Sequence, residues 1–478
     1  MISLWMGIAG ANTVPCHTMV SWQHWHHRQV RYHQMTKDPL QHLDTFETPI
    51  EQVDFSEHFA LHWGENFEDS QRVSDILILL ENSWELQVET WGMEAPVGGS
   101  YFNVYLGGTG SDMPSDFGVA GYYDVDDNGY PMVVLGPYVT DSWSIGQTTV
   151  PHEFFHAVQH RSGQFTQFQD RWYWEASATW VEQEVLSAHP SHADFLFGYA
   201  LRPYLPLAYF ELFSSGNIEE YHPYGAFIFL QYLTEFHVGN DSVARSWTED
   251  GVIESVRPLD WWDNHLFNRQ MDLGELLSDM SAHNVHWDYP NQIIYDTKVD
   301  AYVDTDSSVD ERWAGVLTVD EGGYTVPSTL RPGAYGYNYW SFEEAFEDNR
   351  LVELYFDGTT VGDHFNSVTW RLQLVHQNGD EVQYQSFTAI NGEGVWEVSS
   401  TEIQNATLVV FADAADAHID ETFTYTLGLR SADEPEKRMG CATLSRPLPM
   451  VPLQMAQGLL ILLVPALVRR RNSLRSKG

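Results

Sequence analysis

Two histidines one helical turn apart constrain this chain more than any other feature. They lie in the segment TTVPHEFFHAVQH, where His152 and His156 are four positions apart. Four residues rotate an α-helix only about 40° past a full turn, so both imidazoles project from one face. Imidazoles placed in this way can bind one metal ion, and Glu153 beside them can handle a proton.

The surrounding residues predict how this helix begins and which side is buried. Pro151 is typical of a first helical turn, and Thr148 and Thr149 stand just upstream, where a helix cap is needed. Phe154 and Val158 point away from the histidines and are expected to enter a core. The sequence therefore predicts a helix that starts near Pro151.

A third metal ligand is expected on a second helix. A catalytic zinc site uses three protein ligands and leaves one position open for water. Glu175 lies 19 residues after His156, beyond a polar loop, in the helical run WYWEASATWVEQEVL. The small residue Ala178 shares its face and allows close helix packing. Glu182, two turns further on, is either an outer partner of a ligand histidine or a solvent-facing charge.

These two segments resemble the gluzincin metallopeptidases, in which a glutamate on the helix after HExxH is the third zinc ligand. The pair HEFFH and WEASATWVE is similar in particular to predicted secreted metalloproteases of myxobacteria and related bacteria. The motif covers about forty residues, and ENSWE and YGAFIFLQYL extend the likeness more loosely across residues 45–290. The resemblance implies an α+β fold with a zincin (thermolysin-like) catalytic domain.

The resemblance also implies an activity and a set of roles. One Zn²⁺ would be held by His152, His156 and Glu175, and Glu153 would act as general base in the hydrolysis of peptide bonds in extracellular proteins. An endopeptidase is favoured over an aminopeptidase because the chain lacks a GxMEN-like stretch. The competing hypothesis is a surface-anchored binding or structural protein with a vestigial zinc site.

Zincins of this branch commonly place a tyrosine or histidine near the reacting carbonyl oxygen. The helix predicted over YHPYGAFIFLQYLTEFHV offers Tyr221, His222 and Tyr224 for this role. Tyr224 is favoured slightly, and any of the three could instead be an ordinary aromatic residue at a helix start.

Upstream of the histidines, the pattern predicts the strand, helix, strand and strand of a zincin N-terminal lobe. FALHW, YFNVYLGG and PMVVLGP read as strands, and SDILILLENSWELQVETWG has apolar residues at helical spacing. By the resemblance, PMVVLGP or a strand near it would be the sheet edge that pairs with a substrate peptide.

The segment DVDDNG, Asp124–Gly129, matches the first half of a calcium-binding EF-hand loop. Its twelfth position is Leu135 instead of glutamate, and no flanking helices are evident. A tight Asn-Gly hairpin turn is therefore favoured, with weak Ca²⁺ binding as the alternative.

The charge of the chain excludes one class of partner. Its 67 acidic residues outnumber its 24 basic residues, and the net charge is −43. Nucleic-acid phosphates would be repelled by such a surface, whereas an exposed extracellular protein tolerates it. Two cysteines, Cys16 and Cys441, flank the body of the chain, so no disulfide framework is expected.

Four parts are expected along the chain. Residues 1–44 read as a leader or propeptide-like segment, in which a histidine-rich stretch could also be a second metal site. Residues 45–295 form the predicted metallopeptidase domain. Residues 296–432 contain short alternating strands between turn residues, typical of a β-sandwich that either binds surfaces or stabilises the enzyme.

Residues 433–478 form the fourth part, a linker and a membrane or sorting segment. Cys441 precedes an uncharged stretch over 447–468 and then three arginines. This order resembles a myxobacterial-type C-terminal sorting signal that is removed at the surface, and a single-pass anchor is the alternative. Both predict attachment to a membrane or cell surface, with the bulk of the protein outside the cytoplasm.

Overall fold

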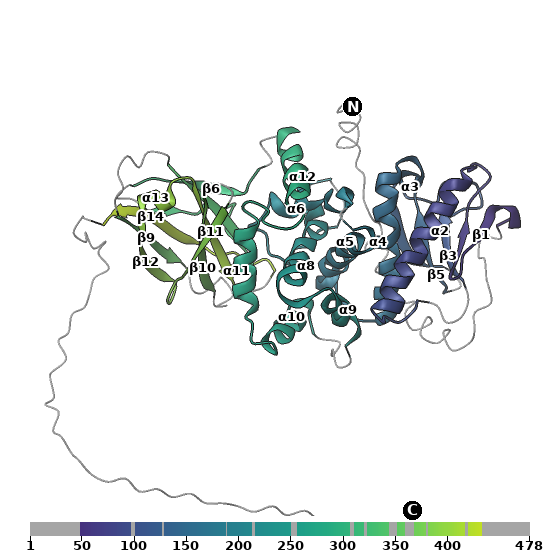
Figure 1. The fold of residues 1–478 in the computed structure, drawn as a ribbon, viewed down its shortest axis with the longest axis horizontal. Helices are drawn as coiled ribbons and strands as arrows, with labels where there is room; N and C mark the ends of the chain where they lie inside the picture. The colour runs from purple at the N-terminus through teal and green to yellow at the C-terminus, as the bar shows by residue number, and fades with distance from the viewer. Residues whose placement is uncertain are drawn as a thin grey trace, which may run out of the picture. The chain divides into compact units, whose positions relative to one another are not determined.

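The computed structural model describes residues 48–96, 101–126, 129–187, 189–212, 216–249, 256–305, 310–319, 323–343, 351–358, 368–378, 381–415 and 419–432. This part of the chain combines α-helices with three β-sheets (Figure 1), which confirms the α+β class. The predicted leader, 1–44, and the predicted C-terminal segment, 433–478, lie outside it. Within it, no helix is both long enough and apolar enough to cross a bilayer.

The first sheet has the strand order β1-β2-β3-β5-β4. Its strands are β1 (Val53–Phe55), β2 (Phe59–His62), β3 (Phe102–Leu106), β4 (Gly121–Val125) and β5 (Pro131–Leu135). The predicted strands FALHW, YFNVYLGG and PMVVLGP are confirmed as β2, β3 and β5, which run parallel to one another. The flanking strands β1 and β4 are antiparallel to their neighbours.

The sequence predicted that PMVVLGP or a strand near it forms a sheet edge, and the structure has the nearby strand there. β5 lies inside the sheet, between β3 and β4, because β4 returns antiparallel along its free side. The edge strand on this side of the sheet is thus β4, next to PMVVLGP, and β1 is at the opposite edge. The turn between β4 and β5 contains the predicted calcium segment, of which residues 127 and 128 lie outside the described part. Its described residues belong to a hairpin, because the backbone N–H of Asp126 donates to the carbonyl of Tyr130 at 2.9 Å.

Two helices cover one face of this sheet, α2 (Ser70–Trp84) and α4 (Trp143–Ser162). Side chains alternate between the two faces of each strand. Val133 and Leu135 of β5 therefore join the core under the helices, while Met132 and Val134 join a smaller cluster on the other face.

The start of α4 differs from the prediction. The helix begins at Trp143, so Pro151 stands in its interior. The hydroxyls of Thr148 and Thr149 do not cap it, because both donate to the carbonyl of Ile145 within the helix, at 3.0 and 2.9 Å. Proline lacks an N–H and removes one helical hydrogen bond, a loss that tertiary packing offsets here because these turns are buried. The helix ends at Gly163, whose φ of 69° suits a left-handed cap.

The other helices before the two-sheet part are mostly C-terminal to α4, except for α3 and two short turns. The longer ones are α5 (Arg171–Leu186), α9 (Asp241–Thr248), α10 (Pro258–Phe267), α11 (Leu273–His283) and α12 (Gln292–Thr305). Short helices are α3 (Pro137–Asp141), α6 (Leu196–Ala200), α7 (His222–Gly225) and α8 (Phe227–Leu233). Single turns of 3₁₀ or π helix are η2 (Ile50–Gln52), η3 (Glu85–Thr90), η4 (Phe168–Asp170), η5 (Pro190–Ala193), η6 (Ile218–Tyr221) and η7 (Thr234–Val238).

The last part of the described chain consists of two sheets around a common apolar core. One sheet has the order β11-β10-β13-β8-β6, and the other has the order β12-β9-β14-β7. Their strands are β6 (Trp313–Leu317), β7 (Tyr324–Thr325), β8 (Tyr337–Phe342), β9 (Leu351–Gly358), β10 (Thr369–Asn378), β11 (Glu381–Thr388), β12 (Glu393–Ser399), β13 (Ala406–Asp413) and β14 (Tyr425–Ser431), with the short helix α13 (Ser400–Ile403). The alternating segments RLQLVHQ, EVQYQSF, GVWEVSS, NATLVVFADA and FTYTLGL predict strands that the structure has as β10 to β14, whereas β6 to β9 were not predicted.

The first of these two sheets also packs on the helices. Alternate residues of β10 point to opposite faces of the sheet. Leu372 and Leu374 enter the core between the two sheets, whereas the amide of Gln373 faces the helices and donates to Asp279 of α11 at 2.8 Å. Main-chain hydrogen bonds join the two parts as well, including one from Tyr337 N to the carbonyl of Pro203 at 2.8 Å. The sheets thus complete the core of the helical part.

Substitution of Gly336 with alanine is expected to loosen this junction. A Cβ atom at Gly336 would lie 2.5 Å from the carbonyl oxygen of Tyr204, a backbone atom that cannot rotate away. We expect a loss of about 1–3 kcal/mol in the free energy of unfolding, measured by urea denaturation. The exposed substitution Gln385→Ala in β11 serves as control and should change it by less than about 0.5 kcal/mol. Equal stability of both variants would contradict the close contact.

Candidate metal centre

The two histidines lie on the buried face of α4. His152 is 4 % exposed and His156 is fully buried. Their ring centroids are 4.8 Å apart and the ring planes are nearly perpendicular, at 87°. The helical spacing thus brings two imidazoles together in a site shielded from bulk water.

Helix α5 brings Glu175 to the same point. Its Oε2 atom lies 3.2 Å from Nε2 of His152 and 3.6 Å from Nε2 of His156. One ligand atom from each of the three residues lies within 4.8 Å of the others, so this buried group could hold a metal ion. It is the one group of this kind found among the described residues.

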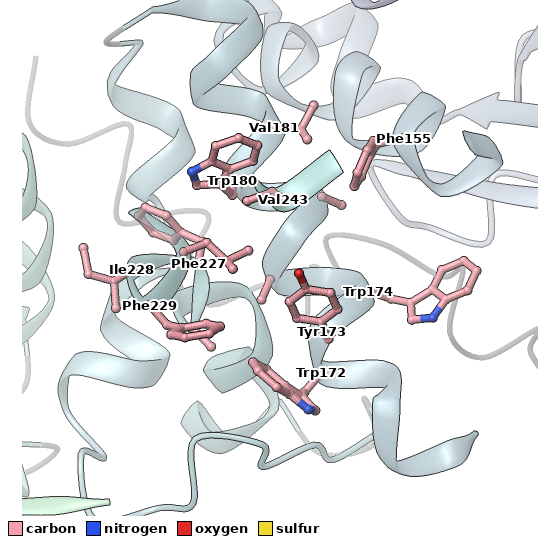
Figure 2. Close-up of a cluster of buried hydrophobic side chains, with 14 of the residues drawn as sticks. Phe155, Trp172, Tyr173, Trp174, Trp180, Val181, Phe227, Ile228, Phe229 and Val243 are labelled. Atoms are coloured by element: carbon pink, nitrogen blue, oxygen red, sulfur yellow. The ribbon is translucent and has the colours of Figure 1, made fainter. Parts of the chain in front are cut away.

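Close packing of α4 and α5 holds these ligands in place. Ala178 of α5 is fully buried, as its predicted place between the helices requires. Figure 2 shows large buried side chains of α5 and of the helices packed against it, and the ring centroid of Trp172 lies 6.1 Å from that of Phe229 on α8. Large buried aromatic groups of this kind restrict the movement of a helix, because interiors are close-packed.

Two polar atoms in the site fit a metal ion. Nε2 of His156 and Oε1 of Glu175 are buried and have no hydrogen-bond partner in the described part of the chain. Buried polar atoms nearly always have a partner, and an ion is one explanation of those that lack one. A cation between these side chains would satisfy both atoms.

The electrostatics also favour a cation. Burial lowers the pKa of His152, but hydrogen bonds to Glu175 and Glu182 outweigh it and raise this pKa to about 10. Burial raises the pKa of Glu175, but the nearby charge of His156 and the hydrogen bond between Glu175 and His152 lower this pKa to about 2. The group therefore stabilises positive charge in its centre.

Glu182 is the hydrogen-bond partner of the candidate ligand His152. It is 7 % exposed, and Nδ1–H of His152 donates to its Oε1 at 2.8 Å. The alternative of a solvent-facing charge is therefore wrong. A carboxylate on Nδ1 directs the Nε2 lone pair toward the site and makes it a better ligand.

The sequence reasoning missed Gln159, the outer partner of the other histidine. Nδ1 of His156 lies 2.7 Å from Oε1 of Gln159. The spacing in the sequence could have indicated this contact, since Gln159 follows His156 by three residues and lies on the same helix face.

Glu153 lies against the edge strand β4. It is fully buried, and a Cβ atom at Gly121 would lie 2.8 Å from Cγ and 3.1 Å from Oε1 of Glu153. The backbone of β4 can approach the carboxylate so closely because Gly121 has no side chain. Further along β4, the hydroxyl of Tyr123 lies 2.6 Å from Nδ1 of His160 on α4. The edge strand is thus held along the helix that carries the histidines.

Of the three candidates on the later helix, Tyr224 is the one that the structure brings to a ligand. Its ring is nearly parallel to that of His152, with centroids 6.0 Å apart and an interplanar angle of 19°. The ring of Tyr221 stacks on Phe195. His222 lies against aromatic rings of other segments, and burial lowers its pKa to about 3.

Comparison with known proteins defines the family of the chain. A family model described as "Family of unknown function (DUF6055)" matches residues 44–425. The chain belongs to this family. The match includes the helical part with its candidate metal centre and the two-sheet part as far as the start of β14.

No curated protein matches the chain. The DUF6055 description carries no activity, so a function has to be argued from the chemistry of the candidate metal centre.

Proposed function

We propose that this member of DUF6055 is a zinc-dependent peptidase with a zincin-type catalytic domain that hydrolyses peptide bonds in extracellular proteins. The observation that carries the proposal is the buried group His152, His156 and Glu175, with the carboxylate of Glu153 on the same helix. A purely structural zinc site has four protein ligands and needs no adjacent base.

The donor set favours zinc among the common metals. Two imidazole nitrogens and one carboxylate form the three-ligand set of catalytic zinc sites, which leaves a position for water or substrate. Magnesium and calcium prefer sites built from oxygen atoms alone. A bound zinc ion supplies Lewis acidity that polarises a carbonyl group and activates a water molecule.

Side chains of the protein supply the proton transfer, the stabilisation of the carbonyl oxygen and the orientation of the ligands. Glu153 takes the proton of the attacking water and delivers it to the leaving amine. Tyr224, stacked beside His152, is the candidate donor to the carbonyl oxygen as that oxygen gains negative charge. Glu182 and the packing of α4 against α5 keep the ligands oriented.

The edge strand β4 supports a peptide as the substrate. Among the described strands none pairs with its outer side, and its Gly121 end lies beside Glu153. An extended peptide that pairs with this strand would place its backbone next to the proposed base. Cleavage within a chain is proposed over removal of an N-terminal residue because the chain lacks a GxMEN-like stretch. The sequence of 433–478 supports a location at the cell surface.

Metal removal tests the proposal. We expect the purified full-length chain to contain about one zinc ion and to cleave unfolded casein. A chelator should abolish cleavage, and added Zn²⁺ should restore it. The measurements are metal content by mass spectrometry and fragment release over time. Zinc without cleavage would favour the binding or structural protein with a vestigial site, and a chain that binds no zinc would overturn the proposal.

A further inference from the structure

Gln159 connects the two helices that carry the metal ligands. It is fully buried on α4, and its side-chain amide makes three contacts. The oxygen Oε1 lies 2.7 Å from Nδ1 of His156. The nitrogen Nε2 donates to the carbonyl of Trp174 at 3.0 Å and to the hydroxyl oxygen of Ser177 at 2.9 Å. These two acceptors stand on either side of Glu175 in α5.

The surroundings permit one orientation of this amide. The carbonyl of Trp174 can only accept a hydrogen bond. The hydroxyl of Ser177 donates its proton to the carbonyl of Tyr173 at 2.6 Å, so its oxygen is left to accept. The NH₂ group of Gln159 must therefore face α5, and its carbonyl oxygen must face His156.

The oriented amide in turn selects a tautomer of His156. An amide oxygen can only accept, so Nδ1 of His156 must carry a hydrogen. In the neutral ring, Nε2 then has a lone pair, and Nε2 is the atom that points toward Glu175. The geometry around Gln159 thus prepares His156 to bind a metal ion through Nε2.

We propose that Gln159 is a positioning residue of the metal centre, which holds His156 in its metal-binding tautomer and fixes the segment of α5 on both sides of Glu175. The inference rests on the proposed metal centre. One amide then aligns two ligands from different helices, and a change at Gln159 disturbs both.

The two ligand histidines have unlike partners. His152 is held by the carboxylate of Glu182, whereas His156 is held by a neutral amide. Three carboxylates, of Glu153, Glu175 and Glu182, are already buried here. A neutral partner supplies the acceptor for His156 without a fourth buried charge.

The test compares metal affinity in substituted full-length chains. Gln159→Met keeps the length of the side chain but removes the acceptor, and Gln159→Glu keeps an acceptor. The control is Gln231→Met, which alters a glutamine that is 1 % exposed on α8 and bonds to Glu235. Zinc affinity is measured by competition with a chromogenic chelator, and the visible absorption of the Co²⁺-substituted chain reports ligand geometry.

We expect Gln159→Met to weaken zinc binding about 10- to 100-fold and to change the Co²⁺ spectrum. Gln159→Glu should bind more tightly than Gln159→Met, and Gln231→Met should match the wild type. Unchanged affinity in Gln159→Met would overturn the inference, and so would an equal loss in Gln231→Met, which would indicate a general effect of altering a buried glutamine.

If the Gln159 variants do not fold, the variant Ser177→Ala tests the same inference. Alanine is favourable in a helix, so this chain should fold, but the amide loses one of its two acceptors. A smaller loss of zinc affinity with an altered Co²⁺ spectrum would support the inference, and wild-type behaviour would overturn it. A wild-type chain that binds no metal would overturn the metal centre and this inference together, whereas zinc binding that is insensitive to Gln159 would overturn the inference alone.

Discussion

Replacing Glu153 with glutamine is expected to lower the rate of peptide cleavage about 10²- to 10⁴-fold, which is the usual contribution of a general base. Glutamine has nearly the same shape as glutamate but cannot accept the proton of the attacking water. Glu153 is not among the three residues that could hold the metal, so the zinc content should stay at that of the wild type. Initial rates and metal content, measured on the same preparation, check both parts.

The control for this experiment is Glu89→Gln, the same chemical change at an exposed position in η3. It should leave rate and zinc content unchanged. A Glu153→Gln chain with full activity would exclude Glu153 as the base. Loss of zinc together with activity would show that Glu153 supports the metal centre, and the base would then have to be sought elsewhere.

Substitution of His156 with alanine is expected to abolish metal binding. The change removes one of three ligands, and two ligands in a buried site hold a metal ion much less tightly than three. The loss of affinity should therefore exceed the roughly 10- to 100-fold effect of altering an outer partner. Zinc content after dialysis and chelator competition are the measurements, and cleavage should disappear in parallel.

His265→Ala is the matched control, since His265 is also buried, at 5 % exposure, but lies on α10 and stacks on Trp261. This variant should retain zinc even if its stability is reduced. Normal zinc content in the His156→Ala chain would contradict the ligand set. The two substitutions are informative together, because the Glu153 variant separates catalysis from metal binding and the His156 variant does not.

The ligand set could be read from the sequence because its spacing is local. Positions 152 and 156 fall on one helix face whatever the rest of the fold does, and Glu175 lies in a second helical run after a loop of suitable length. The same periodicity predicted the side of α5 on which Glu182 lies. Alternating strands between turn residues likewise indicated β10 to β14.

Local rules were misleading where tertiary packing opposes them. Pro151 and the threonines before it read as a helix start, but α4 extends back to Trp143. The added turns are stabilised by burial, since Val150 is fully buried and Gly146 lies close to Val139 of α3. The free energy of this packing exceeds the cost of one missing helical hydrogen bond, which a sequence pattern does not report.

The sequence by itself indicated the two helical segments that carry the candidate ligands, the candidate ligand residues and the α+β class, because these depend on residues close together in the chain. Only the tertiary structure decided which strand forms the sheet edge, that Gly121 brings this edge against Glu153, and that Gln159 links His156 to the helix of Glu175. The contact of Gly121 with Glu153 and that of Gln159 with Trp174 join segments 15 or more residues apart, and such contacts are set by how sheets and helices pack.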